Sequence, residues 1–362
     1  MVRFRLLLSV FALSIVSWHG AGTRGDEVLA LPPLAEEARP AATSAADAPV
    51  PDATETTSVV PWVPGEALEG TGQKEEGKYP SWSAVRVEAL LLWRDAPQSV
   101  PLVDFAGGGT ALDARDLHSA AAAGPRFTLL SEDEDGEGSQ IAYFDVASFQ
   151  ATRRLPTVAG GYVTAPGLDG AAPITVDGAS AGLSSRIKSL EVLDRKRTGE
   201  RWVGTSGFRW VEWQEVFGLG AGPQAFGVRA IDSLYGHQWG LEGVLWRPTE
   251  SVALEGVAKA GIYGNVSKQD SYLSGPGGTP SIATTTARVG FVGEAGLVGT
   301  WRIRPWLAAR AGYQAFWLGG VATATNQLQG QSLAAGSPQR GSTNTGGSVV
   351  LQGIDLGLEG RF

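Results

Sequence analysis

The sequence predicts an all-β fold, an antiparallel up-and-down transmembrane β-barrel of about ten strands (10–12). Three observations predict it. The 362 residues are 43% hydrophobic but only 18% charged, with 50 Gly and 12 Trp. Apolar and polar residues alternate in ten stretches, while no apolar run reaches the roughly 18 residues that a membrane-spanning helix needs. The connections between these stretches are in turn long and short, as in barrels with long loops at one end only.

The N-terminus has the pattern of a signal peptide over residues 1–22. Arg3 and Arg5 precede an apolar stretch at 6–16, and the small residues Gly20, Ala21 and Gly22 follow it. A basic, apolar and then small-residue order is typical of an export signal, and is favoured over a buried N-terminal helix. We therefore expect cleavage near residue 22 and a chain destined for the bacterial outer membrane.

Residues 23–80 predict a disordered, acidic linker rich in Pro and Ala. This stretch holds eight of the 20 prolines and eleven acidic against four basic residues, a net charge of −7. A segment with low hydrophobicity and one sign of charge cannot bury enough apolar surface to offset its loss of conformational entropy. A tether to a cell-wall or protein partner is the alternative.

The barrel is predicted over residues 81–362. Alternation and β-forming residues place its strands at about 82–94, 126–131, 139–150, 183–194, 202–217, 228–246, 251–266, 286–303, 306–321 and 348–362. Every proline beyond residue 80 lies outside these spans, as expected for a residue that cannot donate to a β-ladder. The long connections 104–124 and 156–182 are each long enough to contain a further hairpin.

Side-chain parity predicts one apolar and one charged face, because successive residues of a strand point to opposite sides. The charged face carries both signs, as a narrow lumen would, whereas the apolar face is rich in Ala and Gly. A water-soluble barrel with the faces reversed is the alternative. Strands 183–194 and 202–217 do not alternate cleanly, so no faces are assigned there. The residues predicted to face the lumen are Arg86, Glu88, Arg94, Glu242, Glu255, Lys259, Arg288, Glu294, Arg302, Arg310, Gln314, Asp355, Glu359 and Arg361.

Aromatic residues gather near both ends of the predicted strands, as in the two aromatic girdles of a membrane barrel. Tryptophans 82, 202, 246, 301 and 306 lie at the short-turn end, and Trp93 and Trp317 lie toward the long loops. The last strand alternates apolar residues up to a terminal aromatic. Such an ending is typical of the signal that the barrel assembly machinery recognises, and here it comprises Ile354, Leu356, Leu358 and Phe362.

Several short motifs resemble the beta-barrel porin-7 family of bacterial outer-membrane proteins. They are residues 87–93 (VEALLLW), 207–210 (GFRW) followed by Glu215, 240–246 (GLEGVLW), 259–261 (KAG), 293–297 (GEAGL), 311–314 (AGYQ) and 353–357 (GIDLG). Together they spread over 81–362 in a consistent order. The resemblance implies an outer-membrane barrel and a porin function, without implying a solute.

No enzyme, cofactor or metal site is expected from the sequence. The chain has no Cys, and its net charge of −8 argues against a nucleic-acid partner. The acidic stretch 131–137 lacks the spaced ligands of a calcium loop and predicts a solvated turn. Asp116, His118 and Ser119 are adjacent, which is poor geometry for a catalytic relay. His237 shares the apolar parity of its strand and predicts a residue of the membrane interface.

Three functions stay open at this point. The first is a porin with a narrow or partly plugged channel for small solutes or ions, since barrels with about eight strands are filled by their own side chains. The second is a non-conducting structural or binding barrel that acts through the long loops 95–125, 151–182 and 322–347. The third is a hydrolase at the outer rim that uses His118. The expected partners are outer-membrane lipid and the assembly machinery, with small solutes or ions in the first case.

Overall fold

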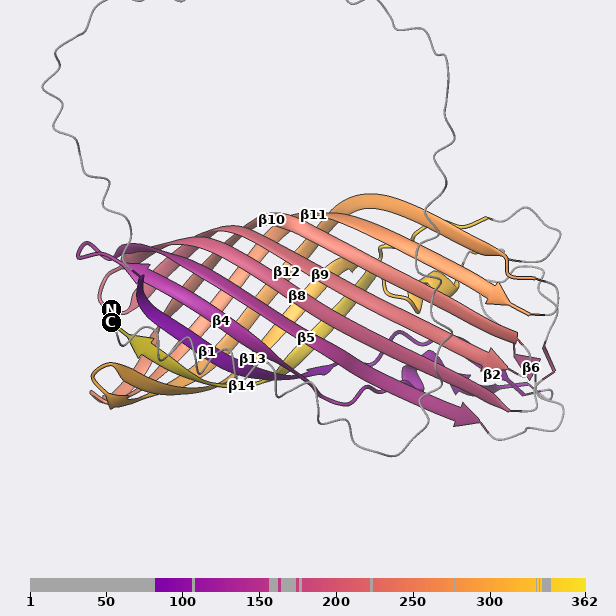
Figure 1. Cartoon of the computed structure of the whole chain (residues 1–362), viewed down its shortest axis with the longest axis horizontal. Helices are drawn as coiled ribbons and strands as arrows, with labels where there is room; N and C mark the ends of the chain where they lie inside the picture. Colours follow the sequence, from indigo (N-terminus) through magenta and orange to yellow (C-terminus); the bar gives the residue numbers. More distant parts are fainter. Residues whose placement is uncertain are drawn as a thin grey trace, which may run out of the picture. The chain divides into compact units, whose positions relative to one another are not determined.

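The computed structural model describes residues 82–105, 108–155, 162–163, 174–175, 178–221, 224–275, 278–329, 331, 333 and 340–362. Within them, ten antiparallel strands form a closed barrel in the spatial order β1-β14-β13-β12-β11-β10-β9-β8-β5-β4 (Figure 1). The predicted signal peptide and linker lie outside these residues. The strands of the barrel are β1 (Trp82–Arg94), β4 (Ala122–Glu132), β5 (Glu137–Leu155), β8 (Ala179–Thr198), β9 (Trp202–Ala221), β10 (Gln224–Thr249), β11 (Val252–Ser274), β12 (Ser281–Arg304), β13 (Leu307–Val321) and β14 (Gly347–Arg361).

The predicted fold class is confirmed, and each of the ten predicted strands corresponds to one strand of the barrel. Each strand pairs with its neighbour in the chain, and β1 closes the barrel on β14, with Ala84 opposite Arg361. The barrel therefore has an up-and-down topology, and β1 begins at the end where β14 finishes. No helix in the described part of the chain is long and apolar enough to cross a membrane.

Two of the predicted long connections are much shorter in the structure. The predicted loop 218–227 is almost entirely strand, because β9 and β10 pair from Gly243↔Trp202 to Gln224↔Ala221. The predicted loop 267–285 is likewise mostly ladder between β11 and β12. Since β10 has 26 residues and a membrane-spanning strand needs only about 9–11, the wall on this side is far longer than a bilayer requires.

Two prolines lie within strands of the barrel, contrary to the expectation that all lie outside. Pro125 in β4 faces Ala89 of β1, but the ladder between β4 and β5 starts only at Arg126. Pro248 in β10 follows a register shift between Trp246 and Thr249. Both therefore occupy strand ends, where a missing backbone donor breaks no ladder on one side.

The two longest connections before β8 do contain short strands, but these are not part of the barrel. They are β2 (Pro101–Asp104), β3 (Thr110–Asp113), β6 (Tyr162–Val163) and β7 (Ile174–Thr175). They form one small sheet in the order β3-β2-β6-β7, so strands from two different loops pair with each other at Asp104↔Tyr162. The long-loop end thus carries an ordered structure of its own.

A β-bulge in β5 changes which residues of that strand face inward. Phe144 and Val146 are buried before the bulge, and Phe149 and Ala151 are buried after it. The register shifts between Ala147 and Phe149, and Ser148 at this point has a φ of 72°. Because of this one extra residue, the inward-facing positions are even-numbered before the bulge and odd-numbered after it.

Candidate functional site

The half of the barrel interior next to the short turns is filled by an ionic layer. Alternation along the strands turns these side chains toward the interior, where seven cations pair with six carboxylates and Asp355 is buried beside them. The ionic layer comprises Arg86, Arg126, Arg195, Arg209, Lys259, Arg310 and Arg361 with Glu88, Glu191, Glu242, Glu255, Glu294, Asp355 and Glu359.

Two buried cations bridge carboxylates from different strands at the centre of this layer. Arg209 on β9 lies 3.0 Å from both Glu191 and Glu294. Lys259 on β11 lies 2.9 Å from Glu191 and 3.9 Å from Glu242. These three carboxylates and two cations lie on β8, β9, β10, β11 and β12, so the network joins five of the ten strands through the lumen.

A second group lies nearer the short turns and is centred on Glu359 of β14. The Glu359 carboxylate forms ion pairs with Arg86 at 2.7 Å, with Arg310 at 3.2 Å and with Arg361 at 2.6 Å. Arg310 also lies 3.1 Å from Glu255. Glu359 is almost fully buried, and it therefore depends on these cations to offset the loss of hydration of its charge.

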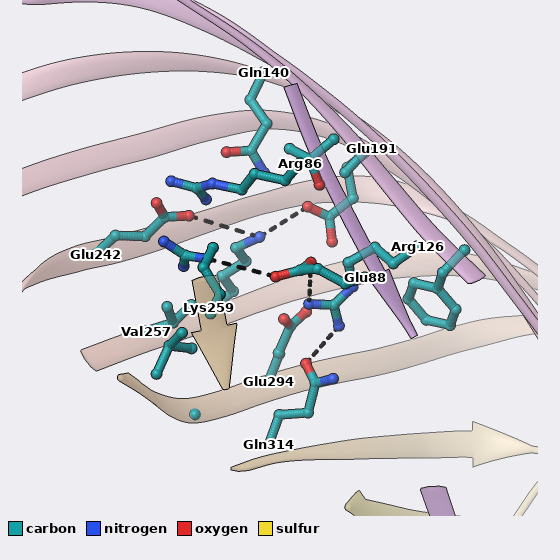
Figure 2. Close-up of a pocket in the computed structure, with 16 residues that line it drawn as sticks. Arg86, Glu88, Arg126, Gln140, Glu191, Glu242, Val257, Lys259, Glu294 and Gln314 are labelled. Carbon is teal, nitrogen blue, oxygen red and sulfur yellow. Dashed lines mark hydrogen bonds and ion pairs between the residues drawn. The ribbon is translucent and has the colours of Figure 1, made fainter. Parts of the chain in front are cut away.

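The space left within the ionic layer is small. A cavity of about 60 Å³ lies among Arg86, Glu88, Lys259, Arg310 and their neighbours. Figure 2 shows their charged ends converging on it, with Lys259 between Glu242 and Glu191 and Arg126 between Glu88 and Gln314. At 10–15 Å³ for each water, the cavity holds roughly four to six waters and no larger solute.

An apolar layer covers the ionic layer on the side of the long loops. Along β1 the order is Arg86 and Glu88, then Leu90 and Leu92, then Arg94, so the charged and apolar levels are successive. All ten strands contribute at least one buried residue to this layer, which therefore crosses the whole lumen. Its members include Leu90, Ala122, Phe144, Ile187, Trp213, Leu234, Tyr263, Val292, Phe316 and Leu351.

Residues 322–328, here called the inward segment, fold into the barrel above the apolar layer. All seven are buried, although they belong to the connection between β13 and β14. The carboxylate of Asp232 accepts the backbone N–H of Ala322 at 3.0 Å, and that of Glu215 accepts the N–H of Ala324. Glu215 is also paired with Arg94. Two buried carboxylates thus hold the inward segment through its main chain.

A second apolar cluster closes the barrel at the long-loop end. It combines strand residues such as Phe217 and Phe226 with Leu102 and Leu112 of the small sheet and Leu328 of the inward segment. The loops are therefore packed into the mouth and are part of the folded structure. From the short-turn end to the long-loop end, the interior holds the ionic layer, the apolar layer, the carboxylates Asp232 and Glu215 that hold the inward segment, and this second apolar cluster, here called the apolar cap.

The outer face of the barrel is apolar and aromatic. Val289, Ile262 and Trp301 are 74%, 62% and 62% exposed, far above what a folded core allows. The predicted apolar parity is therefore the exposed one, on β1, β11, β12, β13 and β14. His237 is exposed on the same face, where its Nε2 lies 2.9 Å from Ser206 Oγ and its ring packs on Trp239.

Charged residues on the outer face occur as neighbouring ion pairs on β5, β8 and β9. Arg186 pairs with Asp145, and Lys188 lies 2.9 Å from Glu212. Alternate residues of β8 and β9 are buried, so these two strands do have distinct faces. Hydropathy does not separate the faces because the inner one mixes Ser with Leu and Ile, while the outer one carries paired charges.

The predicted lumen residues differ in where they lie. Most lie within the ionic layer, Gln314 is buried beside it, and Arg94 is buried higher, against Glu215. Arg288 and Arg302 are exposed instead, Arg288 where β12 extends beyond β13 and Arg302 beside the turn that follows β12. The residues of the predicted assembly signal are exposed, three of them on β14 and Phe362 directly after it.

The sequence did not point to several residues that hold the interior together. Arg126, Glu191, Arg195, Arg209, Glu215 and Asp232 all make buried polar contacts. A signal was present for two of them, because Arg209 and Glu215 share the parity of the buried residues Val211 and Trp213. The anchoring role of Asp232 had none, since its partner Ala322 is 90 residues away.

Among the described residues, no hydrogen bond joins His118 to Asp116 or to Ser119. Asp116 is the last residue of a short 3-10 helix, and its carboxylate accepts the N–H of Asp113 at 3.0 Å. His118 itself is exposed. The Asp116 carboxylate therefore has a capping role and is not directed to the imidazole.

No family model and no curated protein matches this chain, so the resemblance to the porin-7 family stays a prediction. Among solved structures it is similar to Ail, the attachment invasion locus protein of Yersinia pestis (12% identity, TM-score 0.23, 78% of this chain and all of that one). It is also similar to the toluene transporter TodX of Pseudomonas putida (7% identity, TM-score 0.22, 78% of this chain and 90% of that one). A third similar structure is an anion-selective porin from Comamonas acidovorans (9% identity, TM-score 0.16, 78% of this chain and all of that one). These values are too low to inform the function of this chain.

Proposed function

We propose that this chain is an outer-membrane β-barrel with a closed lumen, acting as a structural or binding barrel through its long-loop end. One observation carries the proposal: buried apolar side chains from all ten strands meet across the lumen. Water and ions do not cross such a layer, because desolvating them in an apolar environment costs many kcal/mol. The small sheet at the long-loop end then forms the working end, with the buried inward segment inside the mouth.

The membrane setting is supported by the outer face. A soluble protein rarely exposes an apolar patch beyond a few hundred Å², whereas here large apolar side chains are exposed on most strands. In this proposal residues 1–22 are the cleaved export signal. The outward residues Ile354, Leu356, Leu358 and Phe362 are what the assembly machinery recognises. The short turns then face the periplasm and the small sheet faces outward.

The test is the conductance of refolded, heat-modifiable protein in a planar bilayer, together with swelling of protein-containing vesicles. We expect a folded barrel with no conductance steps and no swelling in small sugars. Reproducible steps that scale with salt concentration in the unmodified protein would overturn the closed lumen. An open barrel of known conductance in the same bilayers controls for insertion.

A narrow ion channel is the second candidate, favoured by the water-sized cavity within the ionic layer. It requires the inward segment and the apolar layer to move together. Deleting residues 323–345 removes the inward segment but leaves the strand side chains of the apolar layer in place. If the deleted protein conducts, and charge reversal at Glu294 changes its ion selectivity, the channel is the better description.

A further inference from the structure

The short-turn edge of β10, β12 and β13 carries three exposed tryptophans. Trp246 of β10 lies opposite Leu254 of β11, and Trp301 of β12 lies opposite Val252 of the same strand. Trp306 belongs to the turn between β12 and β13. The register therefore gathers the three indoles at one part of the rim, and each is about 60% exposed.

Three exposed arginines are sequence neighbours of these indoles, although Arg302, opposite the buried Ala308, shares the inward parity of β12. They are Arg247, next to Trp246, and Arg302 and Arg304, which follow Trp301. Within the described part of the chain, none of the three guanidinium groups has a hydrogen bond or an ion pair. We call these six residues the Trp–Arg edge. It presents three unneutralised cations beside three amphipathic rings.

The neighbouring turn between β8 and β9 shows the contrast. Lys196 and Arg197, on β8 just before the turn, are paired with Glu137 at 2.8 Å and with Glu132, whereas Arg201 within the turn is exposed and makes no ion pair with a described residue. The turn between β4 and β5 is itself acidic over residues 132–137. Among the described residues at this end, the arginines without an ion pair are thus Arg201 and the three of the Trp–Arg edge.

We propose that the Trp–Arg edge binds the phosphate headgroups of anionic phospholipids, in the leaflet that borders the short turns. The inference rests on the proposed membrane-spanning function. A planar guanidinium binds a phosphate through two parallel hydrogen bonds. Indole rings settle at the depth of the headgroups, which brings the arginines to the phosphates. Each basic residue near an anionic surface contributes about fivefold to association, so a pair such as Arg247 and Arg304 contributes about 25-fold.

Tryptophan quenching by brominated lipid tests the proposal, because the three indoles report on the lipid beside them. The protein is refolded into phosphatidylcholine vesicles that contain a small fraction of brominated phosphatidylglycerol or, in parallel, of brominated phosphatidylcholine. We expect the brominated phosphatidylglycerol to quench far more at equal mole fraction. The excess is the signal of the three indoles, and it disappears when Trp246, Trp301 and Trp306 are all replaced by Phe.

The arginine variant R247Q/R304Q should remove this preference, and K196Q/R197Q, with the same change in charge at the same end, should keep it. Equal quenching by the two lipids in the unmodified protein, or a preference retained by R247Q/R304Q, would overturn the proposal. So would a preference that inorganic phosphate abolishes while sodium chloride of equal ionic strength does not, since the site would then bind free phosphate. If the protein does not insert at all, as judged by heat modifiability and protease protection, the membrane-spanning function itself fails.

Discussion

Replacing Asp232 by Ala should release the inward segment from the barrel. In the intact protein the Asp232 carboxylate accepts hydrogen bonds from Ala322 N–H, Asn265 Nδ2 and Ser267 Oγ at 3.0, 2.8 and 2.5 Å. Asn265 retains other partners after the substitution, namely Gly320 O and Ser267 Oγ. Two buried donors then lose their acceptor, the Ser267 hydroxyl and the N–H of Ala322, and only the second belongs to the inward segment.

An unsatisfied buried donor costs about 1–3 kcal/mol, so the inward position should lose about 2 kcal/mol. At 1.4 kcal/mol for each factor of ten, its opening equilibrium shifts about 30-fold. Amide hydrogen exchange measured by mass spectrometry is the assay, because exchange of a locally opening segment follows that equilibrium. We expect amides of residues 323–328 to exchange about 30-fold faster in D232A, and those of β9 to be unchanged.

Two variants make this measurement decisive. Asp232→Asn keeps an acceptor oxygen and should restore most of the protection. Ser271→Ala removes a buried hydroxyl on β11 that is hydrogen-bonded to Gln269 and does not touch the inward segment. Unchanged exchange in D232A, or the same acceleration in S271A, would refute the anchoring role of Asp232.

Three further outcomes follow from the layers and faces of the barrel. Arg209→Met leaves Glu294 buried without a described ion-pair partner, and should lower the free energy of unfolding in detergent by about 3–5 kcal/mol. The double variant R209M/E294Q should recover part of this loss. Leu297→Arg, on the exposed apolar face of β12, should make folding into vesicles less favourable by about 2–4 kcal/mol, whereas Thr249→Arg at the short-turn end should change it little; equal effects would refute the membrane-facing assignment. Asp113→Ala should cost about 1 kcal/mol by removing the cap of the 3-10 helix that follows β3, seen as faster exchange at Arg115, whose N–H the Asp113 carboxylate accepts.

The barrel was predictable from sequence because the period of two is a local property. On β12 and β14 one parity is apolar and the other is charged, and the structure exposes the first. The ends of β9 and β10 were missed because Gly218 and Gly220 read as loop residues, whereas the ladder continues to Gln224↔Ala221. The ends of these strands are determined by pairing between strands, which the sequence of one strand alone does not indicate.

The interior was predictable only as a charged lumen. Membership of the ionic layer follows from parity for residues such as Glu88 and Glu359. The partners of each charge do not, because Arg209 and Glu294 are 85 residues apart. The apolar layer was missed for a related reason: Leu90 and Leu92 share the parity of Arg86 and Glu88. Only the order of levels along the barrel axis separates them.

The bulge at Ser148 gives β5 one residue more than its ladder to β8 uses. Deleting Ser148 would join Ala147↔Arg186 directly to Phe149↔Ser185, and would leave Phe149 and Ala151 facing inward. A substitution at this position must accept a φ of 72°, whereas loss of the residue removes that requirement. At this point of the strand the chain therefore tolerates the loss of a residue better than a β-branched replacement.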